Sequence, residues 1–261
     1  MQFLLAVVGF LFLSIVAQAQ QPDMDKLLER LTFTREKGTL PYRLMKPAGY
    51  DPSGKERYPL VVWLHPLFGR GTDNTKQLRS GVEEFMRDAV RQKHPCFLVV
   101  PQCPPDQMWV KISPVEAKNN LPLAPKPTEP TRLVLDLIDS LVHEHRIDKD
   151  RIYVTGWSMG GYGTWDLISR RPDLFAAAMP LSGGGDPAQA EKFAKLPLWV
   201  FHGALDPLAP VARSRDMIAA IKKAGGEPKY TEYPGVGHDT WTPTYRNSEV
   251  MDWLFGQRRG R

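Results

Sequence analysis

Strand-length apolar runs alternate with amphipathic stretches from residue 58 onward. The runs lie at residues 58–64, 97–101, 151–155, 176–182 and 198–202, and a further strand is predicted at 229–233. Apolar residues recur at helical spacing in the segments between them, which predicts helices over 78–93, 131–145, 162–171, 213–223 and 248–255. Continuous apolar strands alternating with helices indicate an α/β fold whose mostly parallel sheet carries helices on both faces.

Two regions depart from this alternation. Residues 39–46 alternate apolar and polar positions, as an antiparallel edge strand does, after a start at 20–30 that is poorly ordered or forms a short helix over Met24–Leu31. Residues 104–130 contain seven prolines, and such long segments are often functional lids. We interpret this segment as an insertion covering a site, with a plain surface loop as the alternative. Without repeats or a linker, residues 20–261 are predicted to form a single domain.

An apolar run at residues 3–16 is followed by Ala17-Gln-Ala19. This pattern predicts a secretory signal peptide over residues 1–19, although no basic residue precedes the run. The run is shorter than the roughly 20 residues that span a bilayer, so we expect no stable membrane insertion. The mature protein is predicted to be secreted or periplasmic.

The composition is that of a globular protein, with 42% hydrophobic and 24% charged residues. The net charge of +5 comes from scattered basic residues rather than a basic stripe interleaved with aromatics, which argues against a nucleic-acid partner. The only cysteines, Cys96 and Cys103, flank the strand predicted at 97–101. That strand holds them roughly 20 Å apart, too far for a disulfide, so both are predicted to be free thiols. The oligomeric state is left open.

The strongest chemical signal is Gly156-Trp-Ser-Met-Gly160, placed between the strand at 151–155 and the helix at 162–171. A strand, a G-x-S-x-G turn and a helix form the nucleophile elbow, which exposes a strained serine at the carboxyl end of a sheet. Glycines without Cβ atoms let the strand and helix approach closely around the turn. Ser158 is therefore the candidate nucleophile.

A serine hydroxyl needs a base to take its proton. Asp206 follows the strand at 198–202, and His238 lies on a glycine-rich loop after the strand at 229–233. The order Ser158, Asp206, His238 matches that of the α/β-hydrolase triad, with His238 as the base and Asp206 as the group that orients it. Asp239 is the rival acid, but its adjacency to His238 directs its side chain away from that ring.

The remaining histidines are weaker candidates: His94, His143, His145 and His202 lie in a loop, near a helix end or at a strand end. His65 is interpreted as an organiser of its loop. No ligand cluster indicates a metal, and no glycine-rich phosphate loop indicates a nucleotide, so no cofactor is predicted. For an oxyanion hole we expect the amide of Met159 and that of Leu67, with Phe68 as the fallback, because Pro66 has no N–H.

Several motifs together resemble bacterial α/β-hydrolase esterases. They are Leu64-His65, Arg70-Gly-Thr-Asp-Asn74, Pro101-Gln-Cys-Pro104, Gly156–Trp165, Phe201-His-Gly203 with Asp206, and Gly237-His-Asp239. The resemblance covers roughly residues 38–256 and is closest to exported feruloyl-esterase-like and polyhydroxybutyrate-depolymerase-like carboxylesterases, which are relatives of dienelactone hydrolase and the prolyl oligopeptidase catalytic domain. It implies the α/β-hydrolase fold and a secreted serine carboxylesterase acting on a small-molecule or polymeric ester.

The chain departs from that family at one place. Such proteins usually read His-Gly-x-Gly where this chain has His65-Pro-Leu-Phe68, so the oxyanion loop is stiffer and bulkier. Phe68, Trp109, Trp157 and Trp241 are the candidate substrate-binding residues, with ordinary packing as their alternative role. Feruloyl or other aromatic acyl esters of plant polysaccharide are the first expectation, followed by hydroxyalkanoate or aromatic polyesters. A prolyl-oligopeptidase-type peptidase and a non-catalytic binding protein of this fold are the weaker alternatives.

Overall fold

The computed structural model describes residues 23–111 and 121–260 of the 261-residue chain. The predicted signal peptide lies outside the described residues, as does the middle of the proline-rich segment, residues 112–120. Within the described residues, no helix is long and apolar enough to cross a membrane.

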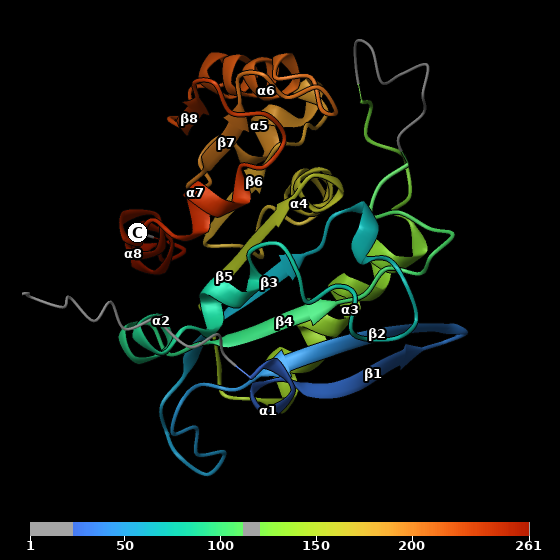
Figure 1. Cartoon of the computed structure of the whole chain (residues 1–261), viewed down its shortest axis with the longest axis vertical. Helices are drawn as coiled ribbons and strands as arrows, with labels where there is room; N and C mark the ends of the chain where they lie inside the picture. The colour runs from blue at the N-terminus through green and yellow to red at the C-terminus, as the bar shows by residue number, and fades with distance from the viewer. Residues whose placement is uncertain (1–22, 112–120, 261) are drawn as a thin grey trace, which may run out of the picture.

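The described strands form one eight-stranded sheet in the order β1-β2-β4-β3-β5-β6-β7-β8 (Figure 1). β1 and β2 form an antiparallel hairpin, β2 is antiparallel to β4, and all other neighbouring strands are parallel. The strands are β1 (Glu29–Arg35), β2 (Gly38–Met45), β3 (Tyr58–Leu64), β4 (Phe97–Pro101), β5 (Ile147–Trp157), β6 (Ala177–Leu181), β7 (Trp199–Gly203) and β8 (Lys229–Tyr233). The predicted mostly parallel sheet is confirmed.

Helices cover both faces of the sheet, and β3 shows why. Leu60, Val62 and Leu64 pack into one core with α3, α4, α5 and α6, while Val61 and Trp63 pack into a second core with η2, α7 and α8, as the two-residue period of a strand requires. The helices are α1 (Met24–Leu27), α2 (Asp88–Lys93), α3 (Glu129–Glu144), α4 (Met159–Arg170), α5 (Ala190–Phe193), α6 (Ala212–Lys223), α7 (Trp241–Tyr245) and α8 (Ser248–Gly256), with short 3-10 helices η1 (Leu67–Gly69), η2 (Val82–Met86) and η4 (Pro187–Gln189).

The N-terminal prediction was wrong in two respects. The helix α1 ends at Leu27, and the residues after it form β1, so β1 rather than β2 is the edge strand. The tight turn between them has Glu36 at φ 55°, a conformation that the side chain of a glutamate does not favour. β1 is mostly exposed along its length, so pairing with β2 rather than its own sequence pattern determines it.

The helix predicted over 78–93 is interrupted. It forms η2 and then α2, separated by Arg87 in an extended conformation (φ −61°, ψ 136°). The apolar residues that suggested one helix are concentrated in η2, which packs on the sheet, whereas α2 buries none of its side chains.

The two cysteines lie at the ends of β4, both buried and both free thiols, which confirms that prediction. Burial raises the pKa of each thiol to about 12, so neither is a thiolate at neutral pH.

His65 organises the loop that follows β3, as expected. The ring is fully buried; its Nε2 accepts the backbone N–H of Cys103 at 2.9 Å, and its Nδ1 donates to the Pro66 carbonyl at 2.7 Å. Burial lowers the pKa of His65 from 6.5 to about 4. The imidazole is therefore neutral at physiological pH, with its proton on Nδ1.

We expect His65 to make the free energy of unfolding decrease as the pH falls from 6.5 to about 4. In that window the unfolded chain binds a proton that the folded chain does not, while above it the contribution is absent. The pKa shift corresponds to roughly 3 kcal/mol. Urea unfolding of the wild type and of His65→Gln across this range measures the effect: the variant should have a shallower pH dependence. Parallel curves would contradict the buried neutral imidazole.

Candidate active site

Ser158 lies at the sharp turn between β5 and α4. Its backbone angles, φ 58° and ψ −119°, are strained for a residue with a Cβ atom. The turn is tight because a Cβ on Gly156 would lie 2.6 Å from the Gly160 carbonyl oxygen, and one on Gly161 would lie 2.2 Å from the carbonyl oxygen of Leu181. This geometry is that of the predicted nucleophile elbow.

Asp206 and His238 come to Ser158 from the loops after β7 and β8. His238 Nε2 lies 2.8 Å from Ser158 Oγ, and His238 Nδ1 lies 2.7 Å from Asp206 Oδ2. A carboxylate on one side of the ring requires the proton on Nδ1, which leaves Nε2 to accept the serine O–H. The three predicted residues therefore lie within hydrogen-bond reach in the order that a nucleophile, a base and an orienting acid require.

The side chain of Asp206 is fully buried. Its Oδ1 accepts the backbone N–H groups of Leu208 and Ala209, each at 2.9 Å. Burial by itself raises the pKa of this carboxyl, but hydrogen bonds from His202 and His238 and from the two backbone N–H groups outweigh it and hold the pKa well below its usual range. The group is therefore an ionised carboxylate at neutral pH.

Asp239, the rival acid, is directed elsewhere. Its carboxylate is exposed and accepts the hydroxyl of Thr242 at 3.1 Å. The backbone of His238 is held instead by Trp157, whose indole N–H donates to the His238 carbonyl at 2.8 Å. The distances therefore favour Asp206 as the partner of His238.

His202 is a neighbour of the acid that the sequence analysis passed over. It is fully buried at the end of β7, and its Nε2 lies 3.3 Å from Asp206 Oδ2 and 2.9 Å from the Ala209 carbonyl oxygen. Its Nδ1 lies 2.7 Å from the hydroxyl of Ser214. Because Nε2 faces two acceptors, it carries a proton and supports the buried carboxylate. The run Phe201-His-Gly203 just before Asp206 was the available signal.

The expected oxyanion donors lie at the starts of two helices. Met159 is the first residue of α4, while Leu67 and Phe68 open η1, so their N–H groups lack acceptors within their own helices. A Cβ on Gly160 would lie 1.9 Å from the Leu64 carbonyl oxygen and 3.1 Å from that of His65. The loop after β3 is therefore packed directly against the elbow.

The four candidate substrate-binding aromatics have different positions. Phe68 is exposed and its ring lies 5.7 Å from that of Trp157, which in turn lies 5.0 Å from the His238 ring and 6.4 Å from that of Trp241. Trp109 is fully buried, and its indole N–H donates to the His65 carbonyl at 3.0 Å. The prediction that Trp109 lines a substrate site was wrong, because the proline-rich segment carries it into the core beneath the loop.

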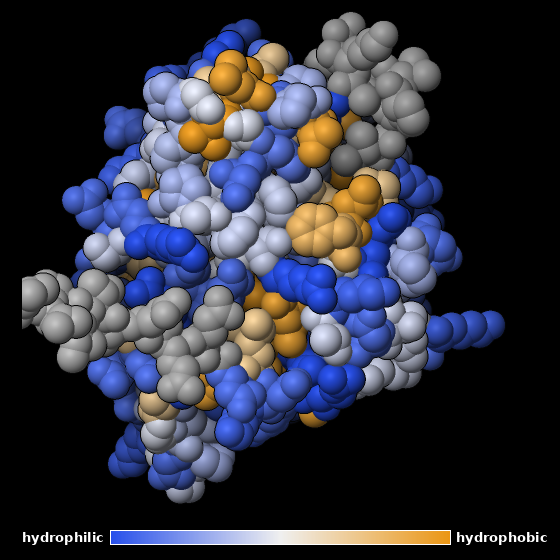
Figure 2. Space-filling view, viewed as in Figure 1, coloured by the Kyte–Doolittle hydropathy of each residue, from blue (hydrophilic) through white to orange (hydrophobic). Residues whose placement is uncertain are grey.

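Four large hydrophobic side chains are 46–74% exposed in the described part of the chain, namely Leu67, Phe68, Leu205 and Leu208. Two follow β3 and two flank Asp206, so these four residues, called here the apolar rim, all lie on loops beside the candidate triad. Figure 2 shows separate hydrophobic patches on the face of the molecule that is in view.

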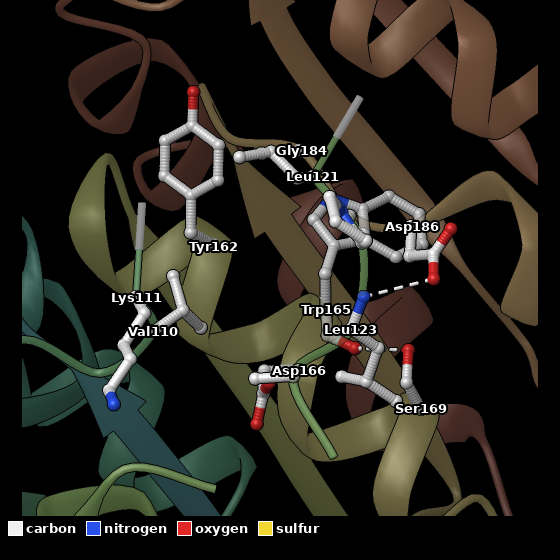
Figure 3. Close-up of a pocket in the computed structure, with 13 residues that line it drawn as sticks. Val110, Lys111, Leu121, Leu123, Tyr162, Trp165, Asp166, Ser169, Gly184 and Asp186 are labelled. Carbon is white, nitrogen blue, oxygen red and sulfur yellow. Dashed lines mark hydrogen bonds between the residues drawn. The ribbon is translucent and has the colours of Figure 1, made fainter. Parts of the chain in front are cut away.

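A small pocket of about 30 Å³ lies beside α4 (Figure 3). Tyr162 and Trp165 of α4 line it together with Asp186, whose carboxylate accepts the backbone N–H of Leu123 at 3.0 Å. None of Ser158, Asp206 and His238 lines this pocket, so we do not assign it to the candidate triad. Among the described residues, no group of three or more His, Cys, Asp or Glu side chains is arranged to hold a metal ion.

Comparison with solved structures shows the same fold. A thermostable esterase superposes with a TM-score of 0.82 at 40% identity, covering 90% of this chain and 64% of that one. A ferulic acid esterase from Anaeromyces mucronatus superposes with a TM-score of 0.64 at 15% identity, covering 88% of this chain and 90% of that one, which is a likeness of fold alone.

Curated relatives match shorter parts of the chain. Cutinase 1 of Thermobifida cellulosilytica is 38% identical over 36% of this chain and 35% of its own length. A bifunctional acetylxylan esterase/xylanase of Neocallimastix patriciarum is 28% identical over 44% of this chain, which spans only 19% of that protein. The model of the dienelactone hydrolase family matches residues 120–250, half of the chain and nearly all of the elements that carry the candidate triad. The chain thus belongs to the dienelactone hydrolase family and has the α/β-hydrolase fold.

Proposed function

We propose that this protein is a serine carboxylesterase that cleaves carboxylic esters through an acyl-enzyme on Ser158. The observation that carries the proposal is the hydrogen-bonded series from Asp206 through His238 to Ser158, at 2.7 and 2.8 Å, with the serine at a strained elbow. The thermostable esterase, cutinase 1 and the acetylxylan esterase/xylanase are all described as ester-cleaving proteins, which supports the same reaction class.

In the proposed mechanism, His238 takes the proton from Ser158 Oγ as this oxygen attacks the ester carbonyl carbon. The carbonyl oxygen becomes an oxyanion that accepts hydrogen bonds from the N–H of Met159 and from that of Leu67 or Phe68. The intermediate collapses, the C–O bond to the alcohol breaks, and His238 donates its proton to the leaving alkoxide. A water molecule then attacks the acyl-enzyme with His238 again as the base, which releases the acid and restores Ser158.

Aromatic acyl esters, such as feruloyl esters of plant polysaccharide, are the first substrate proposal. The Trp157 ring contacts the rings of Phe68, Trp241 and His238, and an aromatic acyl group can stack on exposed aromatic rings such as that of Phe68. The solved ferulic acid esterases share the fold.

A polyester substrate is the second proposal, and the apolar rim favours it. Leu67 and Phe68 follow β3, Leu205 and Leu208 flank Asp206, and all four are exposed, so they could contact an apolar polymer. Relatives include the cutinase above and a poly(3-hydroxyalkanoate) depolymerase of Paucimonas lemoignei, 39% identical over 20% of this chain and 12% of its own length. A peptidase is a weaker alternative, since an acylaminoacyl peptidase of Pyrococcus horikoshii shares only the fold, at 16% identity.

We expect Ser158→Ala to lower kcat/KM for ester hydrolysis by at least about 10⁴-fold, because no other group supplies the nucleophile. The measurement is a panel of acetyl, butyryl, feruloyl and polymeric esters, with a peptide substrate alongside. Preference for feruloyl esters supports the first substrate proposal, and preference for the polymer supports the second. Retained activity in the variant would contradict the nucleophile, and faster peptide cleavage would contradict the esterase.

The two neighbouring acids provide a matched test of the base's partner. Asp206→Asn should lower kcat by about 10³-fold or more, because the amide no longer favours the cationic ring or its tautomer. Asp239→Asn should stay close to wild type, since Asp239 contacts Thr242 rather than His238. The measurement is the kcat of both variants on a p-nitrophenyl ester. A larger loss in Asp239→Asn than in Asp206→Asn would identify Asp239 as the partner of His238.

Export of the protein is also proposed, from the apolar run at residues 3–16 and the Ala17-Gln-Ala19 motif. One relative, from Arthroderma benhamiae, is described as a secreted protein. Expression of the full chain in a bacterial host should yield a protein outside the cytoplasm that begins at Gln20. Amino-terminal sequencing checks this, and an intact Met1 in the exported fraction would exclude cleavage.

A further inference from the structure

The loop after β3, residues 65–69, reads His-Pro-Leu-Phe-Gly, and buried side chains bind two carbonyl groups at its start. The His65 carbonyl accepts the indole N–H of Trp109 at 3.0 Å, and the Pro66 carbonyl accepts His65 Nδ1 at 2.7 Å. Both donor side chains are completely buried. The Trp109 and His65 rings also touch, with centroids 5.0 Å apart.

Side chains also donate hydrogen bonds to carbonyl groups in the second half of the loop. The Leu67 carbonyl accepts Arg70 Nε at 3.2 Å, and the Gly69 carbonyl accepts Gln102 Nε2 at 3.2 Å. Gln102 is fully buried, and its Oε1 accepts the backbone N–H of Asn74 at 2.6 Å. Side-chain donors therefore bind four carbonyls of the loop.

A bound carbonyl also fixes the N–H of its own peptide plane. The peptide is planar and trans, so the N–H of the next residue is directed opposite to the carbonyl. The Pro66 carbonyl shares its plane with the Leu67 N–H, and the Leu67 carbonyl shares its plane with the Phe68 N–H. These two N–H groups are the candidate second oxyanion donors. The direction of the Leu67 N–H depends on the buried contact from His65, and that of the Phe68 N–H depends on the exposed contact from Arg70.

Trp109 ties this loop to the helix that follows the nucleophile. Its backbone carbonyl accepts the hydroxyl of Thr128 at 2.8 Å, at the start of α3. On the other side it packs on α4, where a Cβ on Gly163 would lie 2.9 Å from the Cβ of Trp109. Gly163 lies one turn beyond Met159, the other expected donor. One buried residue is thus in contact with both segments that carry the candidate oxyanion donors, the loop after β3 and the first turns of α4.

We infer that Trp109 is a positioning residue for the oxyanion hole: it holds His65, and His65 holds the peptide that carries the Leu67 N–H. The inference rests on the proposed esterase function. Trp109 does not touch the substrate, so its removal should affect the transition state more than substrate binding. An oxyanion donor gains its strength from preorganisation, and small displacements weaken it.

Trp109→Phe retains an aromatic ring and removes the N–H donor. We expect kcat to fall by about tenfold or more with KM within about twofold of wild type. Affinity for phenylboronic acid, which forms a tetrahedral adduct on an active serine, should weaken in parallel with kcat. Wild-type kcat, or a rise in KM at unchanged kcat, would overturn the inference.

Trp165→Phe is the matched control. Trp165 is also fully buried, but its indole N–H has no hydrogen-bond partner among the described residues, and its ring packs on that of Phe193. Its kcat should remain that of wild type. Equal losses in both variants would mean that removing any buried tryptophan disturbs the enzyme, and would overturn the specific role of Trp109.

A second replacement provides the same test if Trp109→Phe folds poorly. Incorporation of β-(3-benzothienyl)alanine at position 109 keeps the bicyclic ring and replaces the N–H with sulfur, so the same loss of kcat is expected and wild-type kcat would overturn the inference. Ser158→Ala distinguishes the positioning role of Trp109 from the proposed esterase function. An inactive Ser158→Ala with a fully active Trp109→Phe refutes only the positioning role, whereas no esterase activity in the wild type refutes the proposed function.

Discussion

The site depends on one close contact, where the start of α4 lies against the end of β3. At Gly160 there is no room for a Cβ, which would lie 1.9 Å from the Leu64 carbonyl oxygen. This contact fixes three things together: the strained turn at Ser158, the Met159 N–H at the start of the helix, and the loop after β3 that carries the second candidate donor. A larger residue there would separate parts that must act on the same carbonyl oxygen.

The electrostatics of the site depend on the buried carboxylate of Asp206, which accepts several hydrogen bonds. Asp206 accepts hydrogen bonds from His238, from two backbone N–H groups and, at longer range, from His202. Burying a carboxylate is unfavourable unless such donors compensate it, and here they hold its pKa low. Asp239 is adjacent to His238 in sequence but lies in solvent and bonds Thr242. The two acids therefore differ in their surroundings: Asp206 is buried beside His238, whereas Asp239 is exposed to solvent.

The loop after β3 is held by a proline and by side-chain donors on its carbonyls, with one glycine, Gly69, at its end. Glycines allow a backbone to approach a reacting group closely but leave it flexible. In this chain Pro66 restricts the backbone, and the buried side chains of His65, Trp109 and Gln102 bind the carbonyls. The exposed Leu67 and Phe68 side chains then extend outward beside the site. The restricted backbone and two residues of the apolar rim, Leu67 and Phe68, therefore belong to the same short loop.

The sequence by itself determined what is encoded locally. The elbow around Ser158, the strand ends that carry Asp206 and His238, the alternation of strands and helices and the two free thiols could be predicted, because short motifs and apolar periodicity depend on nearby residues. Only the tertiary structure decided the rest. β1 forms because β2 pairs with it, His202 matters because β7 brings it to Asp206, and Trp109 is a core residue because a proline-rich segment passes beneath a distant loop. Each of these depends on contacts between residues far apart in the chain, which a sequence pattern does not record.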